Sequence, residues 1–272
     1  ILLGSDNGGT VTPTDGSVTG DKVASTGAFT IGAAGTTSSI AGANILVEAN
    51  SLFIGDDVSS TTDTAANSVA VGIDALDAVT TGDANVAIGK SALSGNTTGG
   101  DNVAIGNQAL NAPDTESNNI AIGSNALNGS IAGGEYNVAI GSSALAALTS
   151  GDYNVAIGYQ AGDAITTGSE NVLYGKGAGG AITTGSNNLM IGMNAGDGFD
   201  TEANNLGIGT NALGGSIAGG EKNVMIGDNA GDAITSGDSN TGVGYNTQTN
   251  ITTGANNTSL GDDAMNDMVL VT

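Results

Sequence analysis

One short pattern of apolar and polar positions repeats along most of this sequence. In Asn154-Val155-Ala156-Ile157-Gly158, an asparagine precedes three apolar residues, and a glycine ends the run. The equivalent glycine occurs thirteen times at a spacing of 17 residues, which becomes 18 at two steps only. These glycines are Gly55, Gly72, Gly89, Gly106, Gly123, Gly141, Gly158, Gly175, Gly192, Gly209, Gly227, Gly244 and Gly261. Such a repeat predicts a solenoid, because each short unit can bury its apolar side only by stacking on further copies.

The three apolar residues before the glycine predict a short strand with two different faces. We number each coil from its glycine as position 0, so that Val155 and Ile157 stand at positions −3 and −1, and Ala156 at −2. Alternate residues of a strand point to opposite faces. We expect both faces to be buried, with the branched residues at −3 and −1 lining a continuous core. The small residues at −2 would then allow a neighbouring chain to approach closely.

The second half of each coil predicts another short strand between two corners. Position +7 is often apolar, as at Ile165, and Thr166-Thr167-Gly168 follows it as a corner. Glycine every few residues argues against a helix. The chain is therefore expected to be all-β, with about 13 coils of a flattened parallel β-roll over residues 51–265. Residues 1–50 lack the period and form a separate N-terminal segment, and residues 266–272 are a tail or the start of a following segment.

Position −4 predicts a ladder of asparagine side chains along the stack. Each amide can bond to its neighbour in the next coil and to the backbone of the corner. We expect this ladder to be structural. Its members are Asn85, Asn102, Asn119, Asn137, Asn154, Asn171, Asn188, Asn205, Asn223, Asn240 and Asn257.

The charge of the chain restricts its partners. It has 27 Asp and Glu residues against four Lys and Arg residues, for a net charge of −23. A surface this acidic repels phosphate backbones and anionic membranes, so nucleic-acid binding is not expected. The sequence has no run of about 18 apolar residues, which argues against insertion into a membrane.

The residue types leave little room for catalysis. The chain has no His and no Cys, which excludes zinc sites with such ligands, thiol nucleophiles and triads that need His. Carboxylates could still hydrolyse glycosides, but nothing indicates a cleft, so we expect no enzymatic activity and no cofactor. Two acidic pairs replace Thr-Thr-Gly at a corner, and these are either solvated charges or calcium ligands. They are Asp114 with Glu116 and Asp200 with Glu202.

Tyrosines are the candidate ligand-binding residues. Tyr136 and Tyr153 are 17 residues apart and should stack, either as a simple packed pair or as a surface for sugar rings. Tyr159 recurs as Tyr245 after 86 residues, which is five coils or about 24 Å along the stack. Several other features repeat at this offset, including both 18-residue coils. The five-coil period is either a repeated binding epitope or the result of a duplication.

The repeat resembles a known family of fibrous proteins. Asn67-Ser68-Val69-Ala70-Val71-Gly72 is similar to the N-S-V-A-I-G repeat in the heads of YadA-like trimeric autotransporter adhesins, and similar motifs occur in phage tail fibres. The resemblance covers roughly residues 51–265 and implies a left-handed parallel β-roll, a homotrimer and an adhesive role. Residues 15–35 more loosely resemble the Gly- and Thr-rich shafts of phage tail fibres.

The chain is therefore expected to be a segment of an extracellular fibre. The first expectation is a phage tail fibre that contributes to host attachment by multivalent display. The alternatives are the head of a bacterial trimeric surface adhesin and a self-assembling cell-surface filament. The expected partners are two further copies of the chain, other fibre or virion proteins, and a glycan or protein on the host cell.

Overall fold

The computed structural model describes residues 37–40, 43–48, 51–55, 65–113, 115–215 and 219–266. Residues 1–36, with the shaft-like segment, and residues 267–272 lie outside this part, as does the calcium candidate Asp114.

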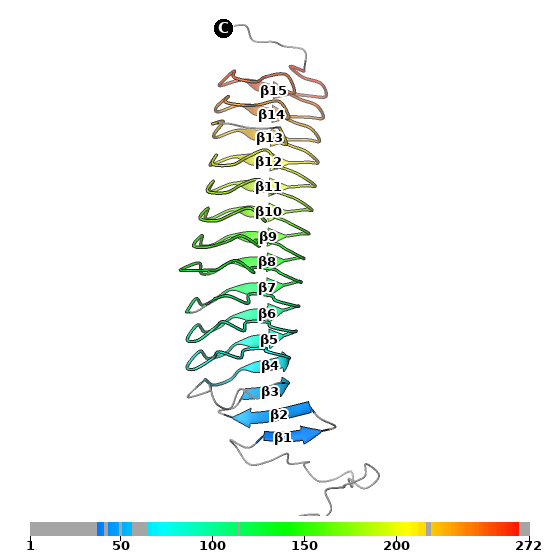
Figure 1. Ribbon diagram of the computed structural model, residues 1–272. Helices are drawn as coiled ribbons and strands as arrows, with labels where there is room; N and C mark the ends of the chain where they lie inside the picture. The colour runs from blue at the N-terminus through cyan, green and yellow to red at the C-terminus, as the bar shows by residue number, and fades with distance from the viewer. Residues whose placement is uncertain are drawn as a thin grey trace, which may run out of the picture.

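The described residues form one sheet of 15 strands in sequence order (Figure 1). Strands β1 to β3 pair antiparallel, and each strand from β3 onward pairs parallel with the next. The strands are β1 (Thr37–Ile40), β2 (Ala43–Glu48), β3 (Ser51–Gly55), β4 (Val69–Gly72), β5 (Val86–Ile88), β6 (Val103–Ile105), β7 (Ile120–Ile122), β8 (Val138–Ile140), β9 (Val155–Ile157), β10 (Val172–Tyr174), β11 (Leu189–Ile191), β12 (Leu206–Ile208), β13 (Val224–Ile226), β14 (Thr241–Val243) and β15 (Thr258–Leu260).

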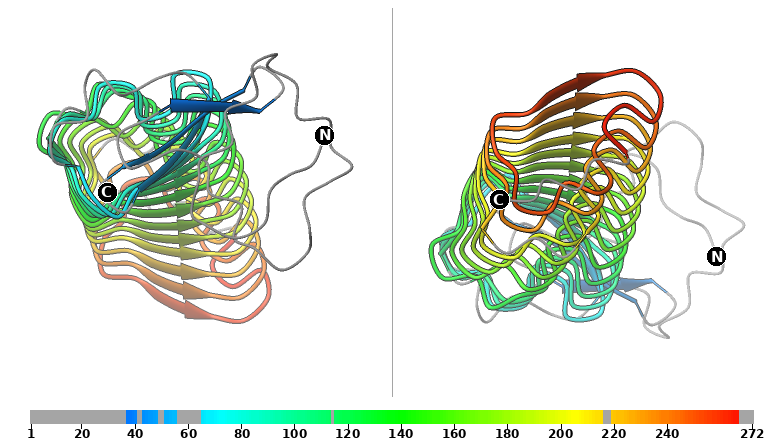
Figure 2. Two further views of the ribbon diagram at one scale, coloured as in Figure 1. Left: turned by 90° about the horizontal axis from the view of Figure 1, so that it is seen from below. Right: turned by 90° about the horizontal axis from the view of Figure 1, so that it is seen from above.

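The chain is a β-solenoid with one strand in each coil. Neighbouring strands pair residue for residue at the sequence period, as where Val155 lies beside Val172 and Ala156 beside Leu173. Viewed along the stack, the coils follow one another around one outline, with the strands in a row on one side (Figure 2). The predicted all-β solenoid with a 17-residue period is confirmed, and no helix is found among the described residues.

The prediction of a second strand in each coil was wrong. Residues 159–164 form consecutive turns rather than a strand. Positions +2 and +4 have positive φ, as in Ser143 (59°) and Leu145 (51°), which an extended strand does not allow. The backbone still bonds from coil to coil, because Leu145 N–H donates to the carbonyl of Ala161 and Gln160 N–H donates to the carbonyl of Ser142.

The assignment of the two strand faces was also wrong. The small residue at −2 points into the solenoid, where Ala87, Ala104 and Ala156 are fully buried. The branched residues at −3 and −1 point outward and are only partly covered, as Val155 and Ile157 are. The alanine row therefore belongs to the core of one chain and cannot contact a neighbouring chain.

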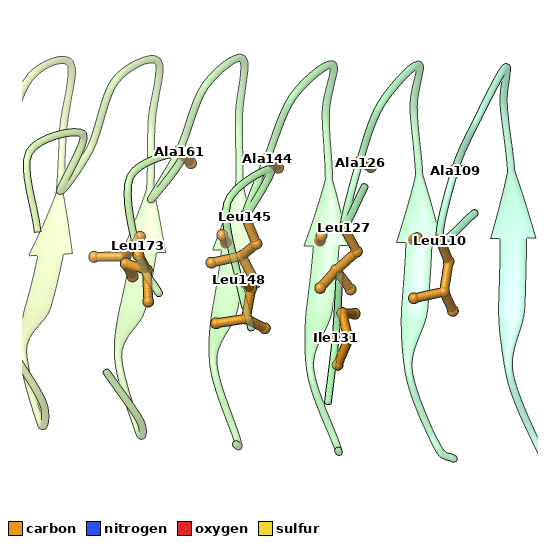
Figure 3. Packing of buried hydrophobic residues seen from close by; sticks show 14 of the residues in the cluster. Ala109, Leu110, Ala126, Leu127, Ile131, Ala144, Leu145, Leu148, Ala161 and Leu173 are labelled. Atoms are coloured by element: carbon orange, nitrogen blue, oxygen red, sulfur yellow. The ribbon is translucent and has the colours of Figure 1, made fainter. Parts of the chain in front are cut away.

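The core has two walls, the strand with position −2 and the opposite segment with position +4. Its thickness stays constant because a large side chain on one wall faces a small one on the other. In most coils where the strand carries Ala at −2, the opposite wall carries Leu at +4, as in Ala139 and Leu145. Ala156 with Gly162 is the exception, and there Leu173 of the next coil fills the space. Where the strand carries Leu173, position +4 is Gly179, and a Cβ there would lie 2.8 Å from Leu173 Cδ2. Met190 with Gly196 and Met225 with Gly231 follow the same rule. Figure 3 shows Leu110, Leu127 and Leu145 in one row, which Leu173 continues from the strand side.

The motif glycine is required by the distance between coils. Gly158 has φ 142°, and a Cβ on it would collide with the carbonyl oxygen of Gly175 in the next coil. Because the same contact recurs in coil after coil, the glycine row allows the backbones to stack closely.

The asparagines at −4 form a buried ladder inside the corner. Asn154 Oδ1 accepts hydrogen bonds from the backbone N–H of Asn171 at 3.1 Å and from its Nδ2 at 3.0 Å. Asn154 Nδ2 donates to the carbonyl of Gly168 at 2.8 Å. Each side chain thus satisfies polar groups in its own coil and in the next one, and so links the two coils.

Candidate functional site

The most extensive candidate surface is the outward face of the parallel sheet, which we call the outer sheet face. It consists of positions −3 and −1 in strands β4 to β15. Position −3 is Val69, Val86, Val103, Ile120, Val138, Val155, Val172, Leu189, Leu206, Val224, Thr241 and Thr258. Position −1 is Val71, Ile88, Ile105, Ile122, Ile140, Ile157, Tyr174, Ile191, Ile208, Ile226, Val243 and Leu260. The face therefore carries two uncharged, mainly apolar rows along the whole stack.

Most acidic residues lie away from these two rows, except Asp228 and Asp262 at position +1. At position −6, Asp83, Asp152 and Asp238 accept hydrogen bonds from backbone N–H groups of the preceding coil, at 2.8 to 2.9 Å. These carboxylates are at the corner that precedes each strand. The negative charge of the chain therefore surrounds an apolar sheet face rather than covering it.

Tyr136 and Tyr153 stack on adjacent coils at position −5. Their ring centroids are 5.0 Å apart and their planes differ by 6°. Each ring therefore covers a face of the other, which leaves less aromatic face for a sugar ring to stack on. This geometry favours the packed pair over the sugar surface.

Three other tyrosines protrude beside or on the outer sheet face. Tyr159 and Tyr245 occupy position +1 and are about half exposed. Tyr174 occupies position −1 of β10 and is 57% exposed. Sequence reasoning had named Tyr159 and Tyr245 but missed Tyr174, although it is the one aromatic residue in a row of aliphatic ones.

The glutamates of the two acidic pairs are buried in the corner, which corrects the expectation that they are solvated charges. Glu116 Oε1 accepts from the backbone N–H of Gly133 at 2.8 Å, and its Oε2 accepts from Thr115 N–H at 3.1 Å. Glu202 accepts in the same way from the N–H groups of Gly219, Asp200 and Thr201. These carboxylates anchor the backbone of the corner, and a calcium ion would have to displace these donors.

The buried glutamates also account for the two 18-residue coils. Glu116 stands at the corner position that is glycine in most coils, and Gly133 lies in the longer coil that follows. The larger loop brings the N–H of Gly133 to the carboxylate. Because Glu202 repeats this arrangement with Gly219, each inserted residue accompanies a glutamate in the coil before it.

Asp163 and Asp197 form a further acidic pair that the sequence analysis did not identify. A Cβ built on Gly180, in the coil between them, would lie 2.9 Å from Asp197 Oδ1 and 3.5 Å from Asp163 Oδ1. Burial raises the pKa of Asp163, and the charge of Asp197 raises it further. Burial also raises the pKa of Asp197.

Among the described residues, no group of three or more His, Cys, Asp or Glu side chains could hold a metal ion. The same part of the chain contains no helix that is long and apolar enough to cross a membrane.

Comparisons with family models, with curated proteins and with solved structures find no match to this chain. The chemistry of its surfaces therefore carries the functional argument.

Proposed function

We propose that residues 51–265 are a rod-like segment of an extracellular attachment fibre, in which three identical chains pack side by side through their outer sheet faces. In this proposal each chain winds as a left-handed β-roll. The observation that carries the proposal is the outer sheet face itself, which is uncharged and mainly apolar along twelve consecutive strands.

The size of this face supports burial in an assembly. From the rise per residue of its three-residue strands and the spacing of strands, it measures about 10 Å by about 58 Å, or roughly 580 Å². A stable protein interface buries about 800 Å² on each partner, so we expect residues beside these strands to take part as well. The largest apolar patch on a monomeric protein is about 300–600 Å² and is often functional.

The charge of the chain favours other copies of itself as the partner. The acidic corners repel one another, so association through any other side of the rod is unfavourable. Contact through the outer sheet faces buries apolar area and keeps the carboxylates in water. Three chains displayed together also turn weak individual contacts with a host surface into higher avidity.

A charge placed on the outer sheet face tests the assembly. We expect the wild-type chain to sediment with three times the mass of one chain, and the Val155→Glu variant to dissociate because three carboxylates would be buried together. Thr167→Glu is the control, because Thr167 is exposed at a corner. A monomeric wild type, or a Val155→Glu variant that remains trimeric, would overturn the proposal.

The attachment role is tested by locating the protein. Gold-labelled antibodies against the chain, applied to the culture that produces it, should mark the tails of phage particles. Labelling of the cell envelope instead would reject the tail-fibre assignment and favour a surface adhesin.

A further inference from the structure

The outer sheet face and its margin are not uniform along the stack. At position +1 most coils carry a polar residue, but Ile73, Tyr159, Met193 and Tyr245 are large, apolar and exposed. Ile73, Tyr159 and Tyr245 are 86 residues apart, which is five coils, and Met193 lies outside this series. One coil after Tyr159, position −1 is Tyr174, which is 57% exposed, where the other coils carry Ile, Val or Leu. We call the positions of Ile73, of Tyr159 with Tyr174, and of Tyr245 the three bulky levels.

Between the bulky levels, the outer sheet face is nearly identical from coil to coil. A second chain displaced by one coil, about 4.8 Å, would meet Val and Ile again at positions −3 and −1. It would lose the contacts of one coil only. Repetitive surfaces of this kind specify their register weakly.

We propose that the bulky levels fix the axial register between the chains of the assembly. This inference rests on the proposed three-chain packing and adds which residues align the chains. A second copy of the chain is the partner that fits, because it carries large side chains at the same five-coil interval. In this proposal the five-coil period has a function, which is to align the chains along their common axis.

The steric argument favours one alignment. When the chains are in register, the large side chains of all three share the same three heights. A shift of one coil spreads them over more heights and holds the flat parts of the faces apart, which costs the packing contacts between them. A shift of five coils brings two levels back into line but leaves five coils of each face uncovered.

A flattened variant tests this assignment. It replaces the bulky residues with those that other coils carry at the same positions, as Ile73→Ser, Tyr159→Ser, Tyr174→Ile and Tyr245→Ser. The control is Tyr136→Asn with Tyr153→Asn, which removes two tyrosines from the corner and leaves the outer sheet face unchanged.

Disulfide trapping reports the register, because the chain has no Cys of its own. Ile105→Cys and Ile122→Cys occupy position −1 on adjacent coils between two bulky levels. Chains with one or the other are mixed, assembled and oxidised, and the disulfides are identified by mass spectrometry. With the bulky levels intact, we expect 105–105 and 122–122 disulfides. In the flattened variant we expect 105–122 disulfides in a comparable amount, and a broad distribution of masses in sedimentation velocity.

The outcomes separate the two proposals. If the flattened variant gives the same disulfides as the wild type and still sediments as one species, the bulky levels do not set the register. If the wild type is trimeric but already forms mixed disulfides, the register assignment fails while the trimer stands. A monomeric wild type overturns both.

Discussion

Glu116 Oε1 lies 2.8 Å from the backbone nitrogen of Gly133, one coil further along the stack. The carboxylate is buried in the corner and accepts from Thr115 N–H as well. Glu202 makes the equivalent bond to Gly219. The two acidic corners are thus internal hydrogen-bond centres, and they explain why the chain departs from its 17-residue period at the same place in each five-coil block.

Removing this carboxylate should destabilise the corner. Glu116→Ala removes the acceptor of two part-buried hydrogen bonds, and we expect a loss of about 0.5–1.5 kcal/mol in the free energy of unfolding. Glu116→Gln keeps one acceptor oxygen and should lose less. Glu170→Ala, at an exposed position, should change stability by less than about 0.5 kcal/mol. Denaturant unfolding measures all three, and faster amide exchange at Gly133 in Glu116→Ala would locate the effect.

Calcium should contribute little to the stability of the described corners. The carboxylates of Glu116 and Glu202 already accept from backbone N–H groups, so we expect a chelator to leave the melting temperature unchanged. Differential scanning calorimetry with and without the chelator checks this. A lower melting temperature with the chelator, absent in a variant with Ala at positions 114, 116, 200 and 202, would show that the acidic pairs bind the metal after all.

The exchange of volume between the two walls of the core gives a double-variant prediction. Leu173→Ala should cost about 2–5 kcal/mol because it leaves a cavity. Gly179→Leu alone should cost about 1–3 kcal/mol because Leu173 already fills the space. Together they recreate the pairing of Ala139 with Leu145, so the double variant should be more stable than the sum of the two losses predicts. Additive losses in denaturant unfolding would contradict this account of the core.

The pair of Asp163 and Asp197 gives a prediction about pH. The fold raises both pKa values above the ordinary 3.8, which means that it favours the protonated carboxyls. Their contribution to stability is complete below pH 3.8 and is lost as the pH rises through the raised values. Asp163→Asn combined with Asp197→Asn should therefore raise the melting temperature at pH 7 and have little effect near pH 3.

A matched substitution separates this effect from a general loss of negative charge. Asp232 occupies the same coil position, and Gly214 and Thr249 occupy it in the adjacent coils. Asp232→Asn should raise the melting temperature at pH 7 by less than Asp163→Asn does. An equal rise would indicate that only the net charge of the chain matters.

The sequence predicted those features of the fold that depend on the repeat length alone. A fixed offset of 17 or 18 residues decides which residues become neighbours in adjacent coils, so the parallel pairing and the stacking of Tyr136 on Tyr153 follow directly. The asparagines at −4 likewise lie one above another because their spacing is the coil length.

The sequence could not decide which face of the strand lies inside. Alternation shows that Val155 and Ile157 share a face opposite to Ala156, but it does not say which side is closed by the rest of the coil. Size suggested the branched face, and this was wrong because Leu145 and Leu148 of the opposite wall already fill the interior. The buried side of a thin solenoid has room for Ala where the other wall supplies Leu.

The second half of the coil was misassigned for a different reason. Its apolar position +7 favoured a strand, its glycines argued against a helix, and nothing in it signals positive φ, which is uncommon for bulky residues. Leu127 and Leu145 nevertheless adopt φ near 50°. The contacts between coils impose this conformation, and a single coil does not encode it locally.

The residues with positive φ give a final prediction, in which stability should increase. Position −5 is left-handed in coil after coil, with φ 59° at Ala84 and φ 60° at Asn187. Asparagine adopts this conformation more readily than alanine. Since Ala84 is exposed, Ala84→Asn should stabilise the chain by about 0.5–1 kcal/mol without disturbing packing. Ala132→Asn is the control, because Ala132 is also exposed but is not among the residues with positive φ. Thermal unfolding should show a higher melting temperature for the first variant only, and an equal gain in both would mean that side-chain polarity, rather than relief of backbone strain, is the cause.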